Sequence, residues 1–171
     1  TLLDVSRICA GRLKLDRGLV DLHGLVREVL ARFQFEIEKK DLKIVQRLEP
    51  VAGRWDRSRL DQVITNLITN AIKYGNGKPI EIAVERDDGH ARLVVADQGI
   101  GIAAGDTERI FNRFERAVTS KNFTGLGLGL YITRQIVRAH GGDIKVESQP
   151  GSGSRFCVDL PVEGDAASVV H

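Results

Sequence analysis

The chain has 171 residues, of which 42% are hydrophobic and 28% charged, and its net charge is +2. This balance is typical of one globular domain and argues against a disordered, coiled-coil or membrane-spanning chain. The low charge, with only six Phe, two Tyr and one Trp, also argues against a nucleic-acid surface. Cys9 and Cys157 fit neither a disulfide framework nor a zinc spacing, so a reducing cytosol is expected.

The first third of the sequence predicts helix, strand, helix and strand in turn. Apolar residues recur at helical spacing over residues 1–10, and Gly11 stands where a helix C-cap would. Asp21 can cap a longer helix, which short alternating stretches flank on both sides. The expected elements are the end of a helix at 1–10, a strand at 13–15, a helix at 21–39 and a strand at 42–48.

Residues 61–74, DQVITNLITNAIKY, predict an amphipathic helix with two chemically different faces. Asn66, Asn70 and Lys73 cluster opposite the apolar residues. Because Asn is a mediocre helix former, two of them one turn apart suggest a site. An amide oxygen suits Mg²⁺ and an ammonium suits phosphate, whereas a plain solvent-exposed polar face is the alternative. The apolar face comprises Leu60, Val63, Ile64, Leu67 and Ala71.

The rest of the chain predicts two hairpins, a second strong helix and a long lid. Asp97 lies at the end of the strand expected at 91–96. Residues 97–124 are then charged and poorly periodic except at 110–114. A segment of that length in a compact domain is typical of a functional lid. The tail from Val162 onward is expected to fray. The expected elements are strands at 80–84, 91–96, 143–148 and 154–160 and a helix at 126–140.

Glycine clusters occur at 97–101, 125–129 and 151–153. The first matches a dinucleotide fingerprint, which we reject because residues 117–125 do not form the strand that this fingerprint needs. The second lacks the ending of a P-loop, but glycine opening a long helix leaves free N–H groups that can hold phosphate. A structural turn is the simpler alternative for this cluster.

The combination of these stretches is more specific than its parts. The five stretches, in chain order, are NLITNAIKY at 66–74, DQGIGI at 97–102, IFNRFER at 110–116, GLGLGLYI at 125–132 and GSGSRF at 151–156. They look like the N, G1, F, G2 and final glycine boxes of the catalytic, ATP-binding domain of sensor histidine kinases, which the chain resembles from about Arg12 to Leu160.

The order of the elements predicts an α/β two-layer sandwich, and the resemblance implies its topology and a domain division. The expected sheet is mixed and mostly antiparallel, and it carries three helices on one face and an ATP lid. Residues 1–11 look like the C-terminal end of a dimerisation and histidine-phosphotransfer helix. Residues 12–161 would then form the catalytic ATP-binding domain, and residues 162–171 a flexible tail.

The resemblance also implies the site on the helix at 61–74. Asn70 would be the Mg²⁺ ligand, and Asn66 would lie beside the phosphates as a catalytic residue. Lys73 and Tyr74 would contact phosphate and ribose. Asp97 would accept a hydrogen bond from the adenine amino group, which guanine cannot donate at that position, and so would set the choice of base.

The glycine boxes and the lid supply the other implied contacts. Gly99 and Gly101 would let the backbone approach the base. Arg116 looks like the lid arginine that meets the γ-phosphate, and Phe111 and Phe114 look like lid anchors, with ordinary core packing as the alternative. The remaining ATP-binding residues that the resemblance implies are Ile102, Gly125, Gly127, Leu128, Gly129 and Leu130.

The function implied is transfer of the ATP γ-phosphoryl group to a histidine on a dimerisation domain, by positioning and charge stabilisation. His23, His90, His140 and His171 have no HExxxP surroundings, so none is expected to be the acceptor, and His140 is interpreted as a helix cap. A cytoplasmic location, a homodimeric full-length protein and a response-regulator partner are expected. The alternatives are an ATPase of the same superfamily, an anti-sigma serine kinase and a non-catalytic ATP-binding module. The related ATPases resemble the chain less, because they carry a Glu where Asn66 stands.

Overall fold

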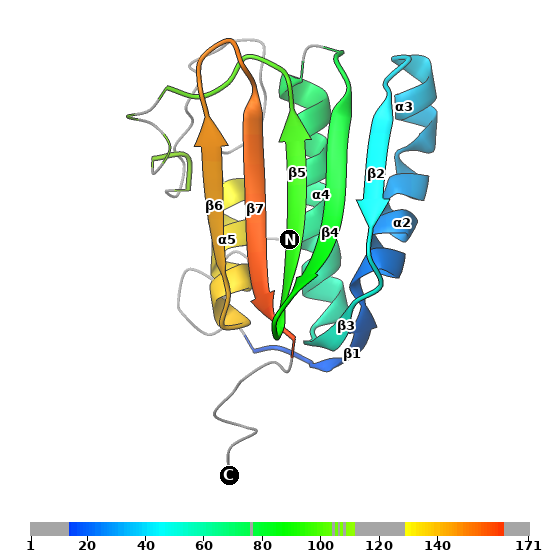
Figure 1. Cartoon of the computed structure of the whole chain (residues 1–171), viewed down its shortest axis with the longest axis vertical. Helices are drawn as coiled ribbons and strands as arrows, with labels where there is room; N and C mark the ends of the chain where they lie inside the picture. The colour runs from blue at the N-terminus through cyan, green and yellow to red at the C-terminus, as the bar shows by residue number, and fades with distance from the viewer. Residues whose placement is uncertain are drawn as a thin grey trace.

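A five-stranded mixed sheet with helices on one face dominates the computed structural model of the chain (Figure 1). The structure describes residues 14–75, 77–103, 105, 107, 109–111 and 129–162. The strands are β1 Gly18–Asp21, β2 Ile44–Leu48, β3 Ala52–Trp55, β4 Ile80–Asp87, β5 His90–Asp97, β6 Asp143–Ser148 and β7 Ser154–Pro161. The helices are α2 Leu22–Arg32, α3 Gln34–Lys39, α4 Arg57–Tyr74, α5 Gly129–Ala139 and the 3-10 helix η2 Arg109–Phe111.

The sheet has the strand order β2-β4-β5-β7-β6, in which only the β2–β4 pair is parallel. The helices α2, α3, α4 and α5 lie on one face of this sheet, so the predicted two-layer α/β sandwich is confirmed (Figure 1). The turn expected between β4 and β5 is present, with Asp88 and Gly89 both at positive φ. A separate small sheet of β1 and β3 closes one end of the helical layer.

Two expected elements differ from the prediction. The helix expected at 21–39 is divided at Phe33, whose N–H donates to Leu30 O, three residues back, at 3.0 Å. This tighter turn lets Phe33 pack against the core, and the single helix expected at 21–39 is replaced by α2 and α3. The strand expected at 13–15 is also displaced, because pairing with β3 fixes the first strand at Gly18–Asp21.

The core lies between α4 and the sheet. The five residues predicted for the apolar face of α4 are each at most 2% exposed. Phe111 is also buried, at 6.3 Å and edge-on to Phe156, with the Arg134 guanidinium 5.2 Å from its ring centroid. Core packing, the simpler of the two interpretations, therefore describes Phe111. Phe114, most of the predicted lid, residues 1–11 and the tail from Glu163 lie outside the described residues.

A polar joint, formed by hydrogen bonds at the N-terminal end of α4, connects three segments of the chain. Asp56 caps α4 by accepting from Arg59 N–H at 3.1 Å, and its other carboxylate oxygen accepts from Asp16 N–H at 2.8 Å. The N–H of Asp56 donates to His140 Nε2 at 3.0 Å, at the end of α5. Arg17 donates to Ala139 O at 3.3 Å. The segment before β1, the start of α4 and the end of α5 thus share one set of hydrogen bonds.

His140 acts in this joint as a neutral acceptor. Its ring is fully buried, and Nδ1 donates to Ile136 O at 2.9 Å, which leaves Nε2 to accept from Asp56. Burial lowers the pKa of the His140 imidazole, and the Arg17 charge acts in the same direction, whereas the Ile136 hydrogen bond and the Asp56 charge oppose them. The bond to Ile136 O caps the last turn of α5 as expected, but a neutral ring makes it rather than a charge opposite the helix dipole.

The buried His140 predicts acid sensitivity of the fold. Because the folded protein disfavours the imidazolium, the unfolded chain binds more protons below the ordinary pKa of 6.5. The contribution of this group to the free energy of unfolding is complete above pH 6.5 and falls by up to ~1.4 kcal/mol per pH unit below it. Urea denaturation between pH 7.5 and 5.5 measures this slope.

Two variants separate His140 from the other titrating groups. His140→Asn should flatten the slope while lowering stability at every pH, and His90→Asn, which removes an exposed imidazole on β5, is the control variant. An unchanged slope in His140→Asn would contradict the assignment.

Candidate functional site

The polar face of α4 is joined to the first turn of α5. The Asn66 amide donates to Gly129 O and to Thr133 Oγ1, both at 3.2 Å, and Thr133 Oγ1 donates to Gly129 O at 2.8 Å. The N–H groups of a first helical turn have no partner within the helix. Asn66 therefore places the start of α5, with these donors and its partial positive charge, beside the polar face of α4.

Asn70 differs from Asn66 in what its side chain contacts. It is half-buried one turn further along α4, and its amide forms no side-chain hydrogen bond with any described residue. Lys73 is exposed and half-buried Tyr74 ends the helix. The chemistry of the Asn70 amide fits the implied Mg²⁺, which takes one or two protein oxygens and completes its shell with water and phosphate oxygens. Among described residues, no group of three or more His, Cys, Asp and Glu could hold a metal ion.

Asp97 lies at the end of β5, where the chain leaves the sheet. Its carboxylate is half-buried and accepts from Gly99 N–H at 2.9 Å. Burial raises the pKa of the Asp97 carboxyl, and backbone hydrogen bonds from Gly99 and Ser154 oppose that change. An acceptor with reduced access to water is suited to a donor supplied by a ligand.

Backbone packing between loops explains three glycines near Asp97. A Cβ built at Gly99 would lie 1.7 Å from Tyr74 O, and one at Gly101 would lie 1.9 Å from Gln149 O. At Gly153 the clash would be with Asp97 O, at 2.1 Å. These glycines therefore hold the Asp97 loop between the end of α4 and the β6–β7 turn. The expected approach of Gly99 and Gly101 to a base stays a prediction beside this observed role.

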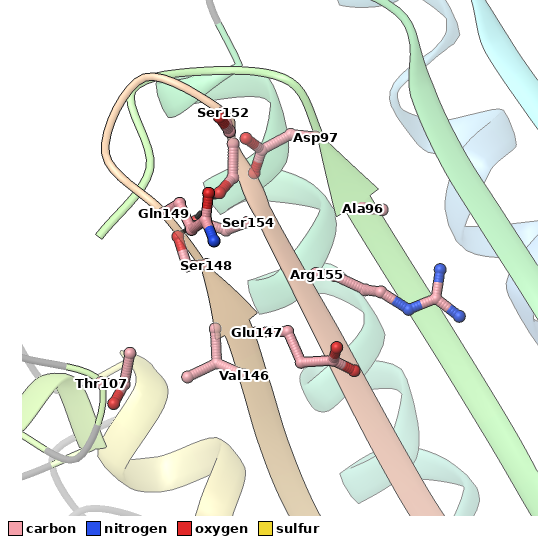
Figure 2. Close-up of a pocket in the computed structure, with 11 residues that line it drawn as sticks. Ala96, Asp97, Thr107, Val146, Glu147, Ser148, Gln149, Ser152, Ser154 and Arg155 are labelled. Atoms are coloured by element: carbon pink, nitrogen blue, oxygen red, sulfur yellow. Dashed lines mark hydrogen bonds between the residues drawn. The ribbon is translucent and has the colours of Figure 1, made fainter. Parts of the chain in front are cut away.

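A pocket of about 500 Å³ opens next to this loop. Figure 2 shows Asp97, Ser148 and Ser154 gathered at the ends of β5, β6 and β7, with Thr107 across the opening. The Ser148 hydroxyl lies 2.9 Å from that of Ser154 and accepts from Ile102 N–H at 2.7 Å. The same end of the sheet thus carries the acidic group, two hydroxyls and the glycine turns.

The structure brings most of the predicted site residues into two neighbouring groups. Asn66, Gly129 and Leu130 meet where α4 contacts α5. Tyr74 joins the Asp97 loop, because its carbonyl accepts from Ile100 N–H at 3.2 Å. Asn70 and Lys73 lie between these groups along α4. The predicted residues Arg116, Gly125, Gly127 and Leu128 lie outside the described residues.

Sequence reasoning missed three polar side chains of this region. Thr133 lies at helical spacing with the apolar Ile136 and Val137, and its fully buried hydroxyl receives the Asn66 hydrogen bond. A threonine inside an apolar stripe is a usable signal, because a buried hydroxyl needs a partner. Ser148 and Ser154 flank the final glycine turn, and no spacing in the sequence reveals that they face each other.

The sandwich and its polar site define a nucleotide-binding domain of the ATPase type. Residues 55–164 match the family described as histidine kinase-, DNA gyrase B-, and HSP90-like ATPase. The chain belongs to this family, and within it the chain is a catalytic ATP-binding domain of the sensor histidine kinase type.

Similar proteins support this placement. Sensor histidine kinase RcsC of Escherichia coli (strain K12) is 35% identical over 95% of this chain, which spans only 18% of RcsC. Full-length ShkA in complex with AMPPNP superposes with a TM-score of 0.84 at 28% identity, covering 96% of this chain and 35% of ShkA. The nucleotide-free catalytic domain of histidine kinase ThkA gives 0.78 at 31% identity, covering 87% of this chain and 97% of that domain. Across the described residues, we find no helix long and apolar enough to cross a membrane.

Proposed function

We propose that residues 12–161 bind Mg²⁺-ATP and transfer its γ-phosphoryl group to a histidine on a dimerisation and phosphotransfer domain of the full-length protein. The observation that carries this proposal is the arrangement of α4 and α5. Asn66 is used to hold the first turn of α5, whereas the Asn70 amide has no side-chain partner among the described residues. The complex of ShkA with AMPPNP, at 28% identity, supports the nucleotide as the ligand.

Each group of residues has a proposed task. Asp97 accepts from the adenine amino group, and Tyr74 and Lys73 contact ribose and phosphate at the end of α4. The amides at the start of α5, at Gly129 and Leu130, hold phosphate oxygens in the proposal, which is supported by the bond from Asn66 to Gly129 O. Gly125, Gly127, Leu128 and the lid residue Arg116 complete this phosphate site in the proposal.

Asn70 is the proposed protein ligand of Mg²⁺. When bound, the metal would neutralise charge on the phosphate oxygens. The protein's own contribution is positioning, because an Asn amide neither gives nor takes a proton at neutral pH. Catalysis of phosphoryl transfer rests on such positioning and on charge stabilisation.

Two properties of Asn66 favour transfer to histidine over ATP hydrolysis: its side chain is an amide, and that amide is hydrogen-bonded to α5. Activation of water needs a general base near the γ-phosphate. At this position the chain has an amide, which already donates to Gly129 O and Thr133 Oγ1. A neutral imidazole is a good nucleophile without such a base, so ATP bound here would wait for the histidine of a separate domain.

Incubation with γ-labelled ATP tests the reaction. The isolated chain should bind ATP, acquire no acid-labile and base-stable label, and turn over far more slowly than the ~1 s⁻¹ or more of ordinary enzymes. Addition of the histidine-bearing domain should transfer label to that domain. Label on the isolated chain, or fast steady hydrolysis, would overturn the proposal, and binding without transfer to the added domain would favour a non-catalytic module.

The full-length protein is proposed to be a homodimer whose phosphohistidine passes its phosphoryl group to a response regulator. A cytoplasmic location for this domain belongs to the same proposal. Both follow from the similarity to sensor histidine kinases, of which the chain spans a part.

A further inference from the structure

We propose that Ser148 is a positioning residue for base recognition, which fixes the Asp97 loop in its binding conformation. This inference rests on the proposed binding of ATP with its adenine at Asp97. Ser148 ends β6 and has no predicted contact with the nucleotide. It would act through the loop at 97–102.

The Ser148 hydroxyl connects three segments of the chain. It donates to Gly153 O at 2.7 Å, and it accepts from Ile102 N–H at 2.7 Å. A hydroxyl has one proton and two lone pairs. Because the proton is used at Gly153, the 2.9 Å contact with Ser154 makes Ser154 the donor. All three hydrogen-bonding positions of this one hydroxyl are then occupied.

The bond to Ile102 holds the loop at 97–102, which carries the base acceptor Asp97. Ile102 ends the loop that begins at Asp97, and the bond to Ser148 is the side-chain bond that holds its distal end. Near its start, Gly99 N–H is bonded to Asp97 itself. The middle of the loop is bonded through Ile100 O, which accepts from Gly151 N–H at 2.7 Å. Loss of the Ser148 hydroxyl would therefore release Ile102 and leave a partly buried N–H without a partner.

The Ser148 hydroxyl is also connected to Asp97 indirectly, through Ser154 and Gly153. Ser154 lies opposite Asp97 in the β5–β7 register, and a backbone hydrogen bond from Ser154 favours the ionised Asp97. Gly153 packs its backbone on Asp97 O. Ser148 bonds to both Ser154 and Gly153, so it fixes the turn against which Asp97 is set. An effect on base selectivity follows, since Asp97 is the group proposed to distinguish adenine from guanine.

The experiment compares nucleotide affinities of Ser148→Ala with those of the unchanged chain by calorimetry. We expect ATP and ADP to weaken by the same factor, about 10-fold for one lost buried hydrogen bond. The ratio of ATP to GTP affinity should fall as well, since the base alone differs between these ligands. Ser152→Ala is the matched control, because the exposed Ser152 lines the same pocket and its hydroxyl takes no part in this network.

A conservative replacement of Ser148 distinguishes a positioning role from an effect on the stability of the fold alone. Ser148→Thr keeps the hydroxyl and should restore most of the affinity and the ATP-to-GTP ratio. A purely structural role would lower the melting temperature and leave that ratio unchanged. Should the alanine variant fail to fold, amide hydrogen exchange of the unchanged chain still applies, and rapid exchange at Ile102 would overturn the inference.

The outcomes distinguish this inference from the proposed function. Failure of the unchanged chain to bind ATP removes the function and the inference together. Normal ATP binding by the unchanged chain with equal affinity in Ser148→Ala removes the positioning role alone. A weaker affinity for ATP with an unchanged affinity for ADP would place the effect at the γ-phosphate and would also contradict the role.

Discussion

Asn70→Ala should greatly weaken Mg²⁺-dependent ATP binding while the fold survives. The side chain is half-buried on the polar face of α4, away from the apolar face that packs against the sheet, and it forms no side-chain hydrogen bond with any described residue. Its removal therefore costs little stability, and alanine is the best helix former. Loss of a metal ligand should weaken Mg²⁺-ATP by on the order of 100-fold.

Thermal melts with and without Mg²⁺-ATP measure this loss, because a ligand that binds only the folded state raises the melting temperature. Thr65→Ala is the matched control. It removes a half-buried polar side chain from the same helix, but one that faces Arg32 and Asp61. The control should keep its nucleotide-induced shift. A full shift in Asn70→Ala would remove Asn70 from the site.

Asp97→Asn should weaken ATP binding by about 10- to 100-fold, because a neutral amide oxygen is a poorer acceptor than a carboxylate. The unchanged chain should bind ATP well and GTP poorly. Guanine presents a carbonyl oxygen where adenine presents its amino group, and that oxygen would face the Asp97 carboxylate. Equal affinities for ATP and GTP in a direct titration would remove Asp97 from base recognition.

The same substitution should leave the stability of the free domain unchanged or raise it. Burial raises the pKa of the Asp97 carboxyl above its ordinary 3.8, so the folded chain binds more protons than the unfolded chain in that range. The contribution of Asp97 to stability is complete below pH 3.8 and is lost as pH rises through the raised pKa. At neutral pH the ionised carboxylate is a net cost, which asparagine removes. A lower melting temperature in Asp97→Asn would show a structural need for the charge.

Local periodicity predicted the elements whose burial follows from their own sequence. The apolar face of α4 was predictable because its residues recur every three or four positions. The hairpin at Asp88 and Gly89 was predictable because positive φ favours those residue types. The site residues of α4 and Asp97 were found because amides on a helix face and an acid at a strand end are unusual. Their grouping then matched a known family.

Contacts between distant segments decided what the sequence could not show. The division of the helix at Phe33 depends on how that ring packs against the core. The first strand was misplaced because its register depends on β3, about 35 residues away along the chain. The bonds from Asn66 to α5 and from Asp56 to His140 join residues more than 60 positions apart. No spacing rule within one element contains such pairs.

The joint at Asp56 connects the start of α4 to the segment that precedes β1. The helix has 18 residues, which at ~1.5 Å each gives an arm of about 27 Å from Asp56 to Tyr74. A displacement of Asp16 would reach Asp56, the N-cap of α4, through one hydrogen bond. Arg17 would transmit it to the last turn of α5 through its bond to Ala139 O. A rigid tilt of α4 by about 5° about Asp56 would move its C-terminal end, at Tyr74, by roughly 2 Å. That displacement would fall on the Tyr74 carbonyl, against which Gly99 is packed.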